Sequence, residues 1–190
     1  MRCVDRSRIK RQKQSMRNHI FTIIGLVLVF NLTSCNIGDV PESMMTVNGE
    51  NMLPSYPPGT SFGIDESAYV SRLPQRGDIV VYNHPKYGLP GLGRVVGLPN
   101  ERIEVKQGLV FIDGIKLNEP YIDTLPTDDD DESIQLGADE FFVILDNRND
   151  LYADRVVITS DLLVGKAVAT CRAGLVVQCE EIEAVNYGYD

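Results

Sequence analysis

The stretch RGDIVVYN, residues 76–83, decides the fold of this chain, because its pattern recurs along most of the sequence. A short run rich in Val and Ile is bounded by Gly and Asn, which are typical of turns between β-strands. Helical periodicity is weak throughout. The pattern predicts a mainly β, barrel-like fold rather than alternating βα units. The other runs of this kind are SFGI (61–64), RVVGL (94–98), RIEVK (102–106), LVFID (109–113), EFFVILD (140–146), GKAVATC (165–171) and LVVQC (175–179).

Two of the connections between these runs have a composition that predicts their structure. Asp113 and Gly114 lie between two apolar runs, and because both residues tolerate positive φ, they predict a tight hairpin. The acidic tract TDDDDES (127–133) lies in a long polar connection, residues 123–138. A calcium loop would need alternating oxygen ligands and a turn glycine, which the tract lacks. It is therefore interpreted as a solvated loop.

Length and charge narrow the functional classes. The chain has 190 residues, 43% of them hydrophobic, which predicts one globular domain of ordinary size. The formal net charge is -9, but the first eighteen residues hold seven bases and one acid. The remainder, with 11 bases and 26 acids, would repel a phosphate backbone. Nucleic-acid binding is therefore not expected.

The N-terminal segment has the layout of an export signal. A basic block precedes an apolar run, IFTIIGLVLVF (20–30), about half the roughly 20 residues that span a bilayer. LTSC (32–35) resembles the lipobox of bacterial lipoproteins, in which the cysteine, here Cys35, is lipidated. An uncleaved anchor is the alternative, and a true start at Met16 would give a compact signal. Residues 36–44 are then a linker, and residues 45–190 form the β domain.

Two cysteines near the C-terminus are candidates for a disulfide. Cys171 and Cys179 flank seven residues, and Ala173-Gly174 between them suits a turn joining two strands. An oxidising compartment outside the membrane favours the bridge, and two buried reduced thiols are the alternative. Neither His nor Cys shows metal-ligand spacing, and His84 is interpreted as a loop residue. No metal or cofactor is expected.

Several segments, in chain order, resemble the type I signal peptidases, the membrane-bound Ser/Lys endopeptidases that remove signal peptides. The likeness covers roughly residues 45 to 170 and rests on breadth, because single short motifs recur by chance. It implies the complex β-fold of that family, a coiled, partly open barrel of antiparallel sheets. The matching segments are NMLP (51–54) for Ser-Met-x-Pro, RGDIVVY (76–82) for Arg-Gly-Asp-Ile-Val-Val-Phe, RVVGLP (94–99) for Lys-Arg-Val-Val-Gly-Leu-Pro, LNEPYI (117–122) for the segment before the variable insertion, and DNR (146–148) for Gly-Asp-Asn-Arg.

The resemblance implies a catalytic serine and lysine, and this chain has neither at the matching positions. Asn51 occupies the serine position, and an amide has no hydroxyl proton to surrender for attack on a carbonyl. Gly93 occupies the position of the lysine base. Losing either member of such a pair costs nearly as much as losing both. The third box departs as well, with Leu145, Leu151, Ala153 and Asp154 at altered positions.

Other residues around the site have two interpretations each. Ser55 and Lys86 are substitute nucleophile and base only if the backbone brings them together. Asp146, Arg148 and Arg155 are interpreted as a buried structural charge network. The candidates for a groove that holds an extended peptide are Gly49, Met52, Pro54, Leu145 and Leu151, and core or rim packing of a β-fold is the alternative.

The sequence thus predicts an exported, lipid-anchored protein of the bacterial cell envelope that binds an extended peptide or a membrane-protein partner without cutting it. The predicted peptide is a signal-peptide-like segment of an exported or membrane protein. The rival hypothesis is a working endopeptidase with a non-standard site such as Ser55 and Lys86. A third interpretation is an exported β domain whose groove is unused.

Overall fold

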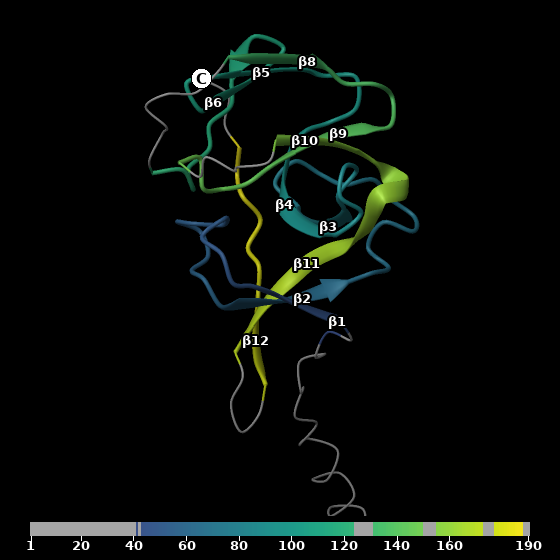
Figure 1. Cartoon of the computed structure of the whole chain (residues 1–190), viewed down its shortest axis with the longest axis vertical. Coiled ribbons are helices and arrows are strands. Elements are labelled where there is room, and N and C mark those ends of the chain that lie inside the picture. The colour runs from purple at the N-terminus through teal and green to yellow at the C-terminus, as the bar shows by residue number, and fades with distance from the viewer. Residues whose placement is uncertain (1–40, 42, 124–130, 150–154, 173–176, 188–190) are drawn as a thin grey trace, which may run out of the picture. The chain divides into compact units, whose positions relative to one another are not determined.

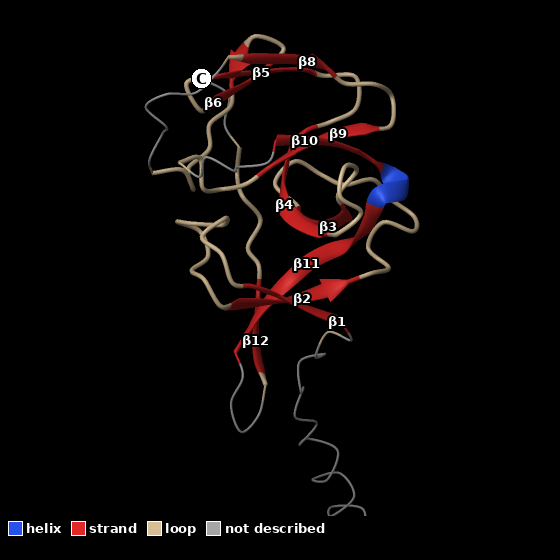
Figure 2. Cartoon of the chain, viewed as in Figure 1, coloured by secondary structure: helices blue, strands red, loops and turns tan. Residues whose placement is uncertain are grey.

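The fold is described here from a computed structural model, which covers residue 41 and residues 43–123, 131–149, 155–172 and 177–187. The chain divides into two units, Met1–Asp39 and Val40–Asp190, and all described residues belong to the second. Within that described part, the second unit is built from strands and one short 3-10 helix, η1 (Ser160–Leu162), which confirms the mainly β prediction (Figure 2). No helix in the described part is long and apolar enough to cross a membrane.

The larger sheet has β11 (Leu163–Arg172) near its centre (Figure 1). This strand pairs with β2 and β12 over its second half and with β3 over its first half, with a register shift in its pairing with each of β2 and β3. The strand order is β1 (Ser43–Val47), β2 (Thr60–Asp65), β11, β3 (Ile79–Asn83), β4 (Pro90–Gly97), β9 (Glu140–Ile144) and β10 (Arg155–Thr159), with β12 (Gln178–Glu181) paired to β11.

The smaller sheet is a meander with one additional strand. Its order is β7 (Ile115–Lys116), β6 (Leu109–Ile112), β5 (Arg102–Lys106) and β8 (Glu132–Gln135). Asp113 and Gly114 join β6 to β7 with φ of 52° and 83°, so the predicted hairpin is confirmed. Gln107 and Gly108 make an equivalent turn between β5 and β6, with φ of 51° and 75°. Glycine suits both turns because it adopts positive φ without a Cβ clash.

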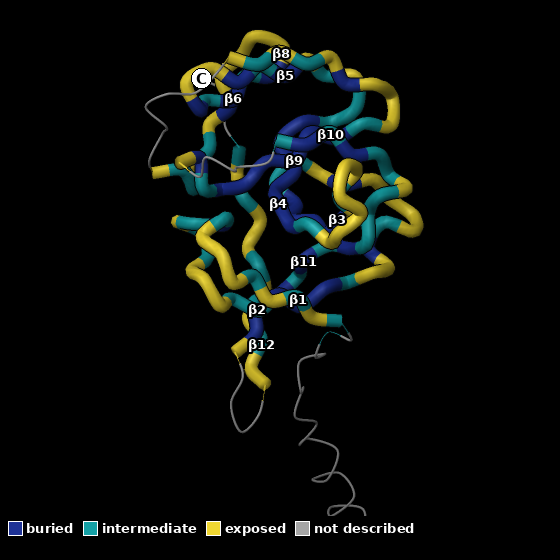
Figure 3. Tube along the Cα trace, in the orientation of Figure 1, coloured by how far each residue is buried: buried dark blue, intermediate teal, exposed yellow. Residues whose placement is uncertain are grey.

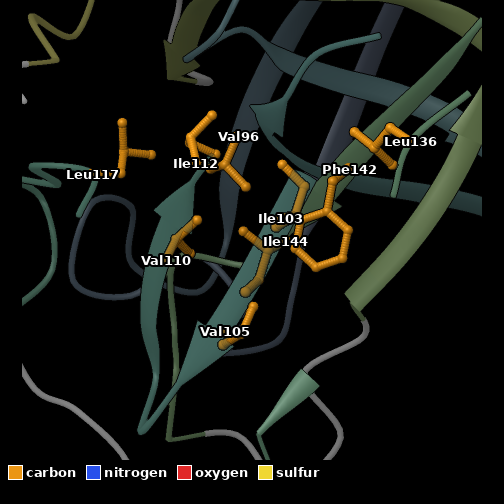
Figure 4. Packing of buried hydrophobic residues seen from close by; sticks show 9 residues of the cluster. All are labelled: Val96, Ile103, Val105, Val110, Ile112, Leu117, Leu136, Phe142 and Ile144. Atoms are coloured by element: carbon orange, nitrogen blue, oxygen red, sulfur yellow. The ribbon is translucent and has the colours of Figure 1, made fainter. Parts of the chain in front are cut away.

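The continuous apolar runs of the central strands are explained by burial on both faces (Figure 3). In β3, Ile79 and Val81 pack into one core cluster with Met52 and Phe62, whereas Val80 and Tyr82 pack into another. A third cluster joins the smaller sheet to β4 and β9 through inward-facing side chains (Figure 4). Its members are Val96, Ile103, Val105, Val110, Ile112, Leu117, Leu136, Phe142 and Ile144.

Three strands differ from the sequence predictions. β1 begins at Ser43, inside the expected linker, and β10 was not anticipated although RVVIT (155–159) is rich in β-branched residues. β8 lies inside the connection interpreted as a loop, because Glu132–Gln135 pairs with β5 in spite of its polar composition. The remainder of the acidic tract up to residue 130, the signal segment, Met16 and Cys35 lie outside the described residues.

Candidate functional site

Asn51 lies in a tight turn that follows β1 and is held from two sides. The Leu53 amide donates to the Glu50 carbonyl at 3.0 Å, which closes the turn internally. Asn147 holds it from outside, because its backbone amide donates to the Asn51 carbonyl at 3.0 Å and its side-chain amide donates to the Glu50 carbonyl at 3.1 Å. A Cβ on Gly49 would overlap the Asn51 Oδ1, so glycine permits the side chain to lie there. Two of the sequence boxes, 51–54 and 146–148, thus meet directly.

The Asn51 turn borders a groove of about 320 Å³. One wall is β1, through residues 45–47, and the other is the β3–β4 hairpin. Gly49 and Leu145 line it as predicted groove candidates. The hairpin and the floor contribute Tyr82, His84, Tyr87, Leu89, Pro90, Gly91 and Leu92.

Two predicted groove residues lie elsewhere. Met52 is only 1% exposed and packs in the core with Phe62 and Leu92, because the turn directs its side chain inward. Pro54 lines a separate depression on the other side of the turn, with Asp146 and Asn147. Leu151 lies outside the described residues. Of the described candidates, Gly49 and Leu145 thus line this groove, whereas Met52 and Pro54 do not.

Gly93 sits in the middle of β4, opposite Val80 of β3. A Cβ added at Gly93 would lie 2.7 Å from Val143 Cγ1 and 3.3 Å from the Ile144 carbonyl oxygen. Valine is short and branched, so it cannot swing aside as the end of a long side chain would. Gly93 is not among the residues that line the groove. The space that a lysine would enter at this position is therefore occupied by core packing.

Ser55 and Lys86 are not paired in this structure. The Ser55 hydroxyl is buried and, among the described residues, is the one side-chain oxygen or nitrogen atom buried without a hydrogen-bond partner. Lys86 is exposed, and its Nζ lies 5.0 Å from the centre of the Tyr87 ring. A serine needs a base within hydrogen-bond distance to be activated. The alternative nucleophile–base pair therefore lacks its required contact here.

A buried charge cluster lies beside the Asn51 turn. Arg94 donates to Asp146 through two bonds, at 2.8 Å and 2.5 Å, and both residues are almost fully buried. Burial lowers the pKa of Arg94, but the hydrogen bonds and charge of Asp146 outweigh it, so the net shift is upward. Arg148 pairs instead with Glu119, at 2.5 Å, and also donates to the carbonyls of Leu145 and Gly108.

Tyrosine side chains complete this cluster. The Arg94 guanidinium lies 4.2 Å from the Tyr121 ring centre, and the Tyr121 hydroxyl donates to Glu119 at 2.6 Å. Tyr187, from the C-terminal segment, packs edge-on against Tyr121 and over Gly77, where a Cβ would clash with its ring. Burial is the main cause that raises the pKa of both Tyr121 and Tyr187. The tyrosines therefore stay neutral and cover the charges.

The predicted charge network thus has different partners from those expected. Asp146 binds Arg94, and Arg148 binds Glu119, because these partners come from β4 and from the loop after β7. Arg155 lies at the start of β10, and its Nη1 is 3.8 Å from a carboxylate oxygen of Glu132 of β8. Arg94 lies in RVVGLP (94–99) and Glu119 in LNEPYI (117–122), two of the segments that resemble the family. Their place in these segments was the one sequence signal that could have identified them as partners.

Cys171 and Cys179 form a disulfide across β11 and β12, where they are direct cross-strand neighbours. From β12 the chain returns across the domain, with Ile182 packed on the Met52 core cluster and Tyr187 on the cluster of the smaller sheet. Among the described residues, His, Cys, Asp and Glu side chains form no group that could hold a metal ion.

The comparison with known families agrees with this arrangement. The family described as "Signal peptidase, peptidase S26" matches residues 15–171. The chain belongs to this signal peptidase family. The match spans the Asn51 turn, the groove and the charged residues of the cluster, whereas Tyr187 lies beyond it.

Named relatives are similar over part of their length. A signal peptidase I of Leptolyngbya laminosa is 34% identical over 133 residues, 64% of this chain and 64% of that protein. A probable signal peptidase I-2 of Synechocystis is 32% identical over 136 residues and is covered to 62%. The chain thus spans less than two thirds of both relatives. A crystal structure of a signal peptidase I from Enterococcus faecalis V583 has a TM-score of 0.42 at 22% identity, covering 50% of this chain and 97% of that one.

Proposed function

We propose that this member of the signal peptidase family binds an extended peptide in the groove between β1 and β4 and does not cleave it. Two observations together carry the proposal: Asn51 lines the groove, and the space beside Gly93 is filled by core packing. The resemblance puts nucleophile and base at these positions. An amide cannot attack a peptide carbonyl, and glycine cannot take a proton. What remains is a site that binds without the groups for acyl transfer.

The groove suits a peptide in strand conformation because it lies between two open strand edges. Among the described strands, none pairs with the outer edge of β1. β4 pairs with β9 only from Arg94 onward, so no strand of the described part pairs with residues 90–93 on that side. Unpaired main-chain groups at a sheet edge are where an added peptide strand hydrogen-bonds. Leu92 and Leu145 supply apolar surface for its side chains.

The site is proposed to act outside the cytoplasm of a bacterial cell, on a signal-peptide-like segment of an exported or membrane protein. The basic block, apolar run and lipobox-like LTSC (32–35) support export and lipid anchoring. The Cys171–Cys179 disulfide supports an oxidising compartment. The acidic charge of the domain argues against a nucleic-acid partner.

The test uses the full chain in detergent micelles and a fluorescent peptide containing an Ala-Gln-Ala segment, the small-residue pattern of signal cleavage sites. Fluorescence anisotropy measures binding, and mass spectrometry measures cleavage. We expect binding without cleavage by the wild type. The absence of binding would refute the peptide-binding proposal, and cleavage would refute the proposed inactivity. Cleavage that disappears in Ser55→Ala would establish the rival endopeptidase.

A gain-of-function variant tests whether restoring the two missing groups restores cleavage. Asn51→Ser with Gly93→Lys restores both reactive groups, but the contact with Val143 makes Val143→Ala necessary as a third change. We expect peptide cleavage by the triple variant and none by Gly93→Lys with Val143→Ala, which lacks the nucleophile. Cleavage by that serine-free control would contradict the assignment of Asn51 as the vacant nucleophile position.

A further inference from the structure

The groove runs along the edges of its two strands rather than across their faces. Side chains on a strand alternate between the two faces of a sheet, so a groove on one face is lined by every second residue. Here three consecutive residues of β1, 45–47, and three of β4, 90–92, all line the groove. A peptide strand held between these edges would therefore continue the sheet, with its own side chains alternating between the same two faces.

The first of these faces is closed by the apolar core. Its lining consists of the groove residues that belong to the Met52 core cluster or pack against it, namely Met45, Val47, Leu92 and Leu145. Every second side chain of a bound peptide would lie against this surface. It suits the two alanines of an Ala-Gln-Ala peptide, whose middle side chain then points to the second face.

The second face is lined by a row of three aromatic rings. Tyr82 belongs to a different core cluster from the one that closes the first face, and its ring lies over Gly91, where a Cβ would come 2.8 Å from Cζ. The His84 ring centre lies 6.3 Å from that of Tyr82 and 4.6 Å from that of Tyr87. These three residues, which we call the aromatic row, all line the groove.

The aromatic row runs from the core to the surface. Tyr82 is only 2% exposed, whereas Tyr87 is 56% exposed even with the Lys86 ammonium 5.0 Å from its ring centre. The described residues that line the groove include no Asp, Glu, Lys or Arg. A charged side chain on the second face would lose hydration without meeting an opposite charge, which costs free energy. The composition of this face therefore favours an uncharged, aromatic side chain.

We infer that the groove selects a peptide with an aromatic side chain between two small residues, in the pattern Ala-Phe-Ala, and that Tyr87 determines this preference. The inference rests on the proposed peptide-binding function of the same groove. Aromatic rings pair offset or edge to face, and such a pair adds to the free energy gained from burying apolar area alone. Tyr87 provides the accessible ring of the aromatic row, because Tyr82 is buried in its own cluster.

The first test compares peptides that differ only at the middle residue. The full chain in detergent micelles is titrated with fluorescent peptides containing Ala-Phe-Ala, Ala-Leu-Ala or Ala-Gln-Ala, and anisotropy gives each Kd. Leucine is the control for apolar area without a ring. We expect the wild type to bind Ala-Phe-Ala about fivefold more tightly than Ala-Leu-Ala, the factor for one aromatic pair. Tyr87→Leu should lose this difference, and Tyr87→Phe, which keeps the ring, should retain it.

The second test asks whether the rings of the peptide must share one face. Ala-Phe-Ala-Phe-Ala places both rings on the same face of a strand. Ala-Phe-Phe-Ala-Ala has the same composition but places one ring on each face in every register. We expect the alternating peptide to bind several-fold more tightly, because the first face is closed by the core.

These tests separate the inference from the function on which it rests. Equal binding of Ala-Phe-Ala and Ala-Leu-Ala by the wild type would overturn the aromatic preference and leave peptide binding in place. An unchanged preference in Tyr87→Leu would overturn the role of Tyr87, and equal affinities of the two isomers would overturn the assignment of the aromatic row to one face. Absence of binding by every peptide would overturn the proposed function, and this inference with it.

Discussion

The two sides of the Asn51 turn differ in almost every physical respect. On one side, Arg94 and Asp146 form a buried ion pair, next to the Arg148–Glu119 pair and tyrosines. On the other side lies a groove that is lined without Asp, Glu, Lys or Arg and has an exposed outer wall. Asn147 connects them, because it follows Asp146 and holds the turn. The turn that carries Asn51 is thus held from the side of the buried charges, through Asn147, and not from the side of the groove.

The largest expected effect comes from breaking the charge cluster. Asp146→Ala leaves the Arg94 guanidinium buried without its partner, and we expect a loss of about 3–5 kcal/mol in the free energy of unfolding. Urea-induced unfolding followed by circular dichroism measures it. The matched control is Glu104→Gln, in an exposed group of ion pairs with Arg102 and Lys106, which should leave the unfolding midpoint unchanged. If both variants unfolded at the same urea concentration, the cluster would not stabilise the fold.

The second-largest loss of stability is expected from removing the disulfide between β11 and β12, the strand that precedes the segment with Tyr187. Replacing Cys171 and Cys179 by serine opens a crosslink with a sequence separation of 8, and a loop of that size predicts a loss of about 2–3 kcal/mol. Wild-type protein in excess reductant should show the same unfolding midpoint as the double variant. A reduced wild type that stayed as stable as the oxidised one would show that β12 is held by its strand pairing alone.

The third effect tests whether the space at Gly93 is filled. Gly93→Ala places a methyl group against Val143, and overpacking of this kind costs about 1–3 kcal/mol in stability. Val143→Ala removes the opposing methyl groups. The double variant should therefore be more stable than the sum of the two single losses predicts, which a double-mutant cycle of unfolding free energies measures. Simple additivity would place the two residues out of contact.

The smallest effect on stability, and the sharpest contrast with the cluster, is expected at the groove wall. Leu89→Ser changes an exposed side chain and should alter the unfolding free energy by no more than about 0.5 kcal/mol. It should nevertheless weaken binding of the Ala-Gln-Ala peptide, because Leu89 lines the groove. Val70→Ser is the control, since Val70 is 84% exposed and does not line the groove. Equal peptide affinities of the two variants would contradict the groove assignment.

Much of the fold can be predicted from short stretches of sequence, because strand composition and turn residues are properties of a few neighbouring residues. The Val- and Ile-rich run 78–83 and the Asp113-Gly114 turn need only their own residues to be recognised, and both predictions are confirmed. β8 is different, because ESIQ (132–135) has no strand composition and becomes a strand through its pairing with β5. Such pairing depends on the rest of the sheet, so a single stretch cannot reveal it.

The candidate site, too, is predictable in part: the sequence identifies its segments but not the contacts between them. The boxes around Asn51 and Asp146 mark residues that the fold does bring together, but the sequence does not say which arginine meets which carboxylate. Arg94 and Asp146 are 52 residues apart in the chain, and their partnership follows from β4 lying beside β9. Likewise, nothing local indicates that Met52 points into the core while Leu89 faces the groove. Side-chain direction at a turn is set by tertiary packing.

The position of β11 has a consequence for how the domain folds. β2 pairs with β11 so that Asp65 lies opposite Lys166, and β3 reaches the same residue through Val80. The centre of the larger sheet therefore cannot form until β11 has been synthesised. Contacts between such distant parts of the chain slow folding, because the intervening loop must close first. Until then β2 and β3 each have an edge without its neighbour, and such open edges are exposed to aggregation.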